Sequence, residues 1–224
     1  YTKVWIHNPG ADAVTARLYL LPRGSSNPAP AWVDVVVAGG ATEAIDNVVE
    51  ALFHVQVMGA MRVTAPSRLL VTSRVYSMAA GQGEKDTVGQ DFAAVPASFA
   101  IGLNERTTVL GVNQTAPSEG SPLRFNYGLV ETTGHATTVH IRVIDAAGTE
   151  LGSEDLQVLA WSQRQVAFKD HFGSISAEDC RLDIEVTAGS GRVIAYGSAI
   201  ANASQDPTTF EMAYPDAVLA GSGL

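Results

Sequence analysis

The chain has 224 residues, enough for one large β domain or for two domains of about 100 residues each. Hydrophobic residues make up 46% and charged residues 17%, with 21 glycines and 10 prolines, which argues against disorder and favours a turn-rich β protein. The formal net charge of −9, without a cluster of lysines or arginines, argues against nucleic acid or an anionic membrane as a partner. A single cysteine, Cys180, excludes an intramolecular disulfide, and no apolar run is long enough for a membrane span.

Alternation of apolar and polar residues, which is typical of half-buried β-strands, recurs along the whole chain. It is clearest in residues 14–20, 137–145 and 182–188. Further strands are expected in residues 1–7, 31–39, 61–67, 68–77, 107–113, 123–132, 154–160, 163–168 and 192–202. Short helical turns are expected only in residues 44–53, where Asp46 or Asn47 would form the cap, and in residues 168–179. The predicted fold class is therefore all-β.

The two halves of the chain carry the same elements in the same order, which predicts an internal duplication. Residues 11–24 align with 134–148, 46–53 with 167–172, and 68–77 with 192–202, so that Ala13 matches Ala136, Phe53 matches Phe172 and Ser73 matches Ser198. We therefore predict two tandem copies of one β-sandwich unit, in residues 1–98 and 99–224, with the boundary near Pro96 to Gly102.

The second copy begins with a strand that the first copy lacks. Residues 105–115 and a loop rich in Pro, Ser and Gly precede the strand at 123–132, whereas the first copy begins directly at Tyr1. The chain opens with neither a methionine nor a signal-like segment, so we expect a processed or truncated start. Either the missing strand lies upstream of Tyr1, or another segment such as residues 210–219 fills its place. A sheet edge left unpaired would invite self-association.

A pattern of polar residues and turns runs through the second copy. It comprises Arg124, Asn126 and Gly128, then Asp145 to Gly148, then Ser198, Asn202, Asp206 and Pro207, and the first copy matches it less well through Asn8-Pro9, Ser73 to Tyr76 and Gly89-Gln90. The pattern resembles that of uncharacterised repeat domains of secreted bacterial proteins, although Glu131 stands where those repeats usually have Asn. The resemblance implies immunoglobulin-like sandwiches in an extracellular or cell-surface setting, with no established activity.

The sequence offers no convincing catalytic group, and we predict no enzyme activity. Ser198 lies inside a strand and lacks the second glycine of a nucleophile elbow. Cys180 is flanked by Glu178 and Asp179, which disfavour a reactive thiolate. The five histidines show no zinc-ligand spacing.

Calcium is the one cofactor that the sequence leaves open, because carboxylates and amide oxygens gather near two predicted turns. The candidate ligands are Asp145, Glu150, Glu154 and Asp155 around one hairpin, and Asn202 and Asp206 at the end of the second copy. The alternative interpretation is that these residues shape turns and end strands.

Carbohydrate binding would need exposed aromatic side chains. Trp161 is the candidate, since it falls at a predicted turn where the first copy has Gly39 or Gly40. Packing at the seam between the two copies is nevertheless the favoured interpretation of Trp161, and Trp5 and Trp32 are expected to help bury sheet faces.

The sequence thus predicts a non-catalytic structural or adhesion module of a secreted or cell-surface bacterial protein. Its partner would be a protein or polysaccharide surface, or a second copy that pairs through an edge strand. The alternative is a carbohydrate-binding accessory module, and a third hypothesis is a hydrolase whose site is assembled between the two copies.

Overall fold

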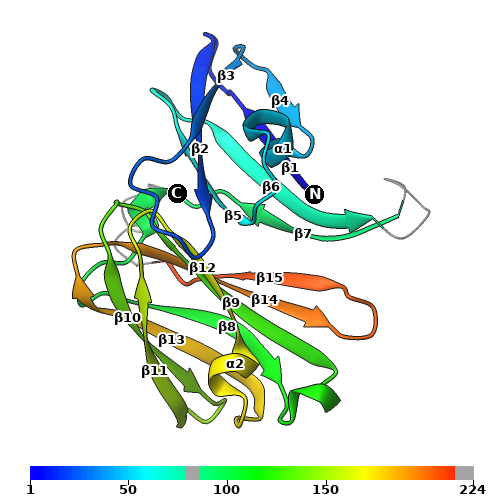
Figure 1. The fold of residues 1–224 in the computed structure, drawn as a ribbon, viewed down its shortest axis with the longest axis vertical. Helices are drawn as coiled ribbons and strands as arrows, with labels where there is room; N and C mark the ends of the chain where they lie inside the picture. The colour runs from blue at the N-terminus through cyan, green and yellow to red at the C-terminus, as the bar shows by residue number, and fades with distance from the viewer. Residues whose placement is uncertain (79–85, 215–224) are drawn as a thin grey trace. The chain divides into compact units, whose positions relative to one another are not determined.

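The structure is a computed structural model that describes residues 1–78 and 86–214. It is mostly β, with four antiparallel sheets and a few short helices (Figure 1). The chain divides into two compact units, residues 1–23 with 29–94, and residues 24–28 with 95–224. Each unit is a pair of sheets with apolar side chains between them, so the predicted all-β fold of two sandwich-like units is confirmed.

The first unit places its apolar core between a four-stranded and a three-stranded sheet. The elements are β1 (Thr2–His7), β2 (Val14–Pro22), β3 (Trp32–Val37), β4 (Thr42–Ile45), α1 (Val48–Phe53), β5 (Gly59–Thr64), β6 (Leu70–Met78) and β7 (Thr87–Ala93). The sheets have the orders β4-β1-β6-β7 and β3-β2-β5 (Figure 1). The buried side chains of the core are Val4, Ile6, Ala16, Leu18, Val37 and Val48.

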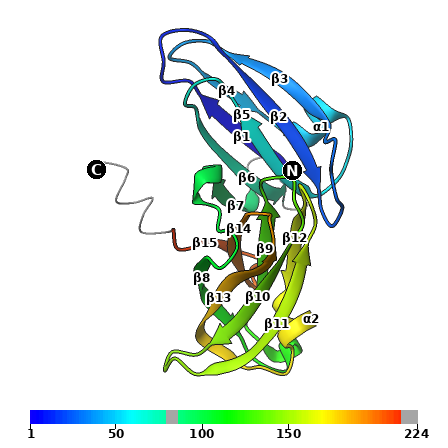
Figure 2. The ribbon, with the colours of Figure 1, turned by 90° about the vertical axis from the view of Figure 1, so that its left-hand side faces the viewer.

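The second unit has two four-stranded sheets, whose layers are seen side-on in Figure 2. Its elements are the 3-10 turns η2 (Ala97–Phe99) and η3 (Ser118–Gly120), β8 (Arg106–Gln114), β9 (Leu123–Glu131), β10 (Thr137–Ile144), β11 (Glu150–Val158), β12 (Gln163–Ala167), α2 (Phe168–Phe172), β13 (Ala177–Gly189), β14 (Val193–Ala201) and β15 (Pro207–Glu211). The sheet orders are β11-β10-β13-β8 and β12-β9-β14-β15.

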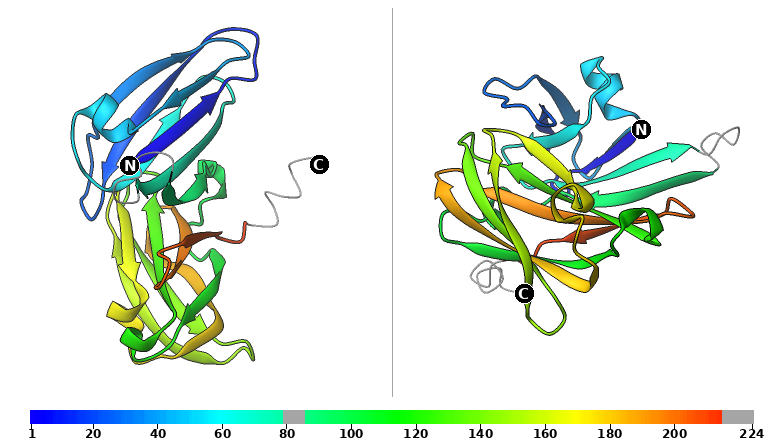
Figure 3. Two further views of the ribbon diagram at one scale, coloured as in Figure 1. Left: turned by 90° about the vertical axis from the view of Figure 1, so that its right-hand side faces the viewer. Right: turned by 60° about the horizontal axis from the view of Figure 1, so that its bottom comes forward.

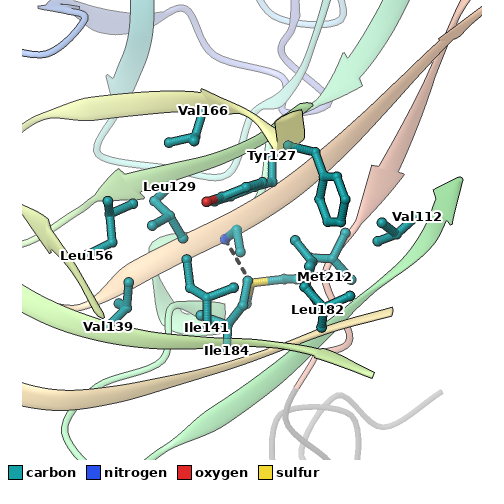
Figure 4. Close-up of a cluster of buried hydrophobic side chains, with 14 of the residues drawn as sticks. Val112, Tyr127, Leu129, Val139, Ile141, Leu156, Val166, Leu182, Ile184 and Met212 are labelled. Carbon is teal, nitrogen blue, oxygen red and sulfur yellow. Dashed lines mark hydrogen bonds between the residues drawn. The ribbon is translucent and has the colours of Figure 1, made fainter. Parts of the chain in front are cut away.

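A larger and more continuous core fills the second unit. Side chains from both sheets interdigitate there, including Tyr127, Leu129, Ile141, Leu182 and Ile184 (Figure 4). The Ala195 N–H donates a hydrogen bond of 3.1 Å to Met212 Sδ inside this core. Met212 follows β15, so the chain beyond the last strand also helps to close the sandwich.

The two units share one strand order. The sheet β4-β1-β6-β7 corresponds to β12-β9-β14-β15, and β3-β2-β5 corresponds to β11-β10-β13, with β8 added beyond β13. Each short helix follows the corresponding strand, β4 or β12, and ends at a phenylalanine, Phe53 or Phe172 (Figure 3). Positions in one unit can therefore be compared with equivalent positions in the other.

Two details of the sequence interpretation are wrong. Val4 pairs with Ser73 and Tyr127 pairs with Gly197, so Ser73 corresponds to Gly197, one residue from the predicted Ser198. Asn47 does stand at the start of α1, but its backbone is left-handed with φ 46° and its side chain caps no N–H. Its amide instead donates to Glu50 Oε2 at 2.6 Å.

Candidate functional site

The outer edge of β5 is the feature in which the two units differ most. In the second unit β8 pairs antiparallel with the corresponding edge of β13. In the part of the chain that the structure describes, no strand pairs with β5 on the side away from β2. The segment 210–219 is the one expected to fill this place. Its residues 210 and 211 belong to β15 and pair with β14, its residues 212 and 213 contact β8, and residues 215–219 lie outside the described residues.

The open edge leaves apolar side chains of the first unit partly in water. Met61 lies opposite Leu20 in the β2–β5 pair, and Val63 lies opposite Leu18. In the second unit the equivalent positions of β13 are held by Leu182 and Ile184. Leu182 and Ile184 are buried, whereas Met61 and Val63 are only half-buried. On the facing sheet Val75 is 42% exposed, while the equivalent Ala199 is 9% exposed. Full burial of one such side chain stabilises a fold by about 1.5–3 kcal/mol, so the edge has free energy to gain from a covering strand.

Further apolar side chains are exposed directly ahead of β5. They are Val55, Val57 and Met58, of which Met58 is 74% exposed. Native sheet edges are usually protected by short strands, charges or covering segments. A strand with one edge unpaired among the described residues, next to exposed apolar side chains, therefore marks a surface suited to binding another strand.

Two buried polar side chains hold the loops at the end of β1 and of β9. Asn8 Oδ1 accepts a 3.0 Å hydrogen bond from the Gly10 N–H, and its Nδ2 donates to the Val37 carbonyl at 3.1 Å. Glu131 stands at the equivalent position and accepts from the Thr133 N–H at 2.7 Å. The break at Asn8-Pro9-Gly10 is thus a braced turn between two strands, and it has a counterpart in the second unit.

The Glu131 carboxylate serves more loops than an asparagine can. It accepts backbone hydrogen bonds from Thr133 and Gly134, from Trp161 and from Arg192, which lie in three different loops. An amide has one acceptor oxygen, whereas a carboxylate has two. Glu131 therefore serves more donors than an asparagine could, and these donors offset the cost of burying its charge.

Trp161 lies in a strained turn and packs on its own unit. Its φ is 50°, and the equivalent Gly40 has a φ of 69°, so a bulky residue occupies a position that suits glycine. The indole lies over Gly134, where any side chain would collide with it. The backbone N–H of Trp161 donates to Glu131 Oε2 at 2.8 Å, and the half-buried indole packs against Gly134, which accounts for the side chain.

Trp32 is the aromatic residue that the structure exposes, contrary to the expectation that it buries a sheet face. Its side chain is 51% exposed on the outer face of the β3-β2-β5 sheet. The Arg17 guanidinium stacks on it at 3.7 Å from the ring centroid and also holds Asp34 at 2.7 and 2.8 Å. Tyr19 is the direct cross-strand neighbour of Trp32. Two aromatic rings and an ion pair thus form a rigid polar-aromatic face.

The candidate calcium ligands are used for turns and ion pairs. Asp145 Oδ1 accepts from the Ala147 and Thr149 N–H groups at 2.9 and 2.7 Å, and Asp155 pairs with His140 at 2.8 Å. Asn202 Oδ1 accepts from Arg124 at 2.8 Å. Glu150 and Asp206 are exposed. Within residues 1–78 and 86–214 no three acidic, histidine or cysteine side chains come together as a metal site.

A hydrogen-bonded relay of three residues, which runs from the buried Tyr127 to the exposed His171, was missed by the sequence interpretation. The Tyr127 hydroxyl donates to Glu154 Oε1, and His171 Nδ1 hydrogen-bonds Glu154 Oε2. The three residues come from β9, β11 and α2, so the relay ties the two sheets to the helix (Figure 1). One signal was present: Glu154 shares the alternation of the buried Leu156 and therefore points inward. Tyr127 is fully buried, Glu154 is half-buried and His171 is exposed, so the relay ties the inside of the unit to its surface.

The remaining nucleophile candidates are buried. Ser198 lies in β14 with 1% of its surface exposed. Burial raises the pKa of the Cys180 thiol, and nearby acidic side chains raise it further, which keeps the thiol protonated and unreactive at neutral pH. None of the helices among the described residues has the length and apolarity that a membrane crossing requires.

We predict that Glu131→Ala lowers the free energy of unfolding of the second unit by about 2–4 kcal/mol, because several buried N–H groups lose their acceptor. Urea unfolding followed by Trp161 fluorescence, with Trp5 and Trp32 replaced by phenylalanine, measures the change. Glu150→Ala, at an exposed position of the same unit, is the matched control and should stay within about 0.5 kcal/mol of the parent. Equal stability of the two variants would contradict the role given to Glu131.

The Tyr127 relay predicts a loss of stability in alkali. Burial, and then the hydrogen bond to Glu154, raise the pKa of Tyr127 above its ordinary value of 10.0. Below pH 10 the folded and unfolded chains both hold the proton, and above it only the folded chain does. The stability therefore falls above pH 10, with a contribution of about 1.4 kcal/mol per pH unit from this residue.

The variant Tyr127→Phe tests this contribution, since all other tyrosines are common to both chains. It should be less stable than the parent at pH 8, because the half-buried Glu154 loses a donor, and its stability should decline less steeply above pH 10. Urea unfolding at several pH values gives both slopes, and identical slopes would show that Tyr127 does not hold its proton as inferred.

Comparison with known proteins gives little guidance. No family model matches the chain, and no curated protein matches it. A solved structure described as the crystal structure of PBSX exported protein XepA is similar at 14% identity, over 88% of this chain and 75% of that chain, with a TM-score of 0.20. A similarity this low carries no inference about fold or function.

Proposed function

We propose that this chain is a non-catalytic structural or adhesion module of a secreted or cell-surface bacterial protein, built from two duplicated immunoglobulin-like sandwiches. The observation that carries the proposal is the open edge of β5, beside half-buried Met61 and Val63. A sheet edge of this kind joins polypeptides through main-chain hydrogen bonds and apolar contact, and it needs no reacting group.

The use of the polar side chains supports a structural role. Glu131 binds loop N–H groups, Glu154 links the two sheets, and Arg124 donates to Asn202 and Gln205 at 2.8 and 2.7 Å to hold the β14–β15 turn. Each of these polar groups makes contacts that stabilise the fold. The secreted setting rests on the resemblance of the second unit to repeat domains of secreted bacterial proteins.

Carbohydrate binding is the second candidate, and the exposed outer face of the β3-β2-β5 sheet favours it. Trp32 and Tyr19 lie side by side in register, and Arg17 and Asp34 supply hydrogen-bonding groups next to them. Aromatic rings with adjacent polar groups are suited to stacking against sugar rings. The candidate surface is thus the Trp32 face, and Trp161 has the weaker claim because its indole packs on Gly134.

We expect the full chain to self-associate through the β5 edge. Val63→Glu places a carboxylate among the half-buried side chains of this edge and should abolish the association, which sedimentation velocity measures over a wide concentration range. Val36→Glu makes the same charge change on the outer face of β3, where Val36 is 62% exposed, and should leave the association intact. A chain that stays monomeric at every concentration would count against the structural proposal.

For the carbohydrate candidate, electrophoresis through gels that contain a soluble polysaccharide should retard the chain, and Trp32→Ala should remove the retardation. Trp161→Ala is the matched control, an equal truncation of the packed tryptophan. Loss of retardation in Trp161→Ala alone would instead assign the sugar site to the loop end of the second unit. Absence of retardation with every polysaccharide would reject this candidate.

A further inference from the structure

We propose that the open edge of β5 is a socket for a single β-strand of a partner polypeptide with the residue pattern of β8. This inference rests on the proposed function and names the kind of segment that completes the first unit. The second unit shows the completed state, because β8 lies on the equivalent edge there. The partner strand would run antiparallel to β5, as β8 does to β13.

The registers of the second unit define where each residue of the partner strand would lie. Val109 faces Leu182 and Thr107 faces Ile184 in the β8–β13 pair. Since Met61 and Val63 are equivalent to Leu182 and Ile184, a residue like Val109 would lie opposite Met61. A residue like Thr107 would lie opposite Val63, and the strand would continue past Gly59.

The inward positions of this strand must be small and apolar or β-branched, and the outward positions are unrestricted. In β8 the side chains of Thr107, Val109 and Val112 are buried, whereas Leu110 is 61% exposed. Val109 reaches the facing sheet, where it lies against Gly197 of β14. The first unit has Ser73 at the equivalent position, which leaves less room, so the residue of the partner strand there must be no larger than valine. A charged residue at the Val109 position would have to be buried without a partner, at a cost that prevents binding.

A second copy of the chain fits this place less well than a single strand does. β8 is held on both of its edges, because Val109 forms a bridge to Met212 and the Ala213 N–H donates to the Thr108 carbonyl at 2.8 Å. The strand is therefore enclosed between the two sheets of its unit. A β5 strand from a second copy carries β2 on its other edge and cannot be enclosed in this way. Self-association through β5 is the weaker contact that a fitting strand would displace.

The chain itself supplies the probe, a synthetic peptide of residues 105–115. We expect it to bind the full chain with a stoichiometry of one, to raise the melting temperature of the first unit and to disperse the self-associated chain. A peptide with Val109→Lys should bind at least about tenfold more weakly, and one with Leu110→Lys, an equal change at an outward position, should bind like the parent. Calorimetry and sedimentation measure these effects.

Hydrogen exchange on the unmodified chain locates the bound peptide without relying on a variant that might fail to fold. The proposal requires new protection of the amides of residues 59–64. Protection of β13 instead would show that the peptide exchanges with β8 in the second unit, and it would overturn the proposal.

The peptide and self-association experiments together separate this proposal from the proposed function. If the peptide does not bind while self-association is still abolished by Val63→Glu, the proposed β8-type partner strand is wrong and the proposed function stands. If self-association is absent as well, both fail.

Discussion

Closure of a sandwich depends on how its sheet edges are covered, and β8 performs this task in the second unit. It pairs with β13 on one side and forms a bridge to Met212, which follows β15, on the other. Because both edges are covered, Leu182 and Ile184 lose contact with water and join a core that runs through both sheets. The first unit has the same strand order without this strand, and its core is accordingly smaller.

The loop ends show a second consequence of the shared strand order. Asn8 and Glu131 stand at equivalent strand ends, and each accepts a hydrogen bond from the N–H two residues further along. The amide oxygen of Asn8 accepts from the Gly10 N–H. The carboxylate of Glu131 accepts from backbone N–H groups of three loops. One backbone geometry thus accommodates either a neutral or a charged side chain, provided that each buried group finds partners.

Much of the fold was predictable from the period of two in the apolar residues, together with glycine and proline at the turns. The same alternation also contained information that the sequence interpretation did not use. Trp32 shares its side of β3 with Asp34, which places both in water, and Glu154 shares its side of β11 with Leu156, which turns it inward. The alternation within single strands could not predict which separate elements pack against one another. Tyr127, Glu154 and His171 meet only because two sheets and a short helix pack together.

The scattering of the expected calcium ligands follows from the same geometry and bears on the kind of protein this is. Successive residues of a strand point to opposite faces, so Glu154 and Asp155 cannot converge on one ion however close they lie in sequence. Glu154 reaches the core and Asp155 pairs with His140 on the outside. Most of these side chains are thus used in ties that hold strands, loops and helices together. The proposed binding at the β5 edge would instead be main-chain recognition, supported by the alternate apolar side chains Met61 and Val63.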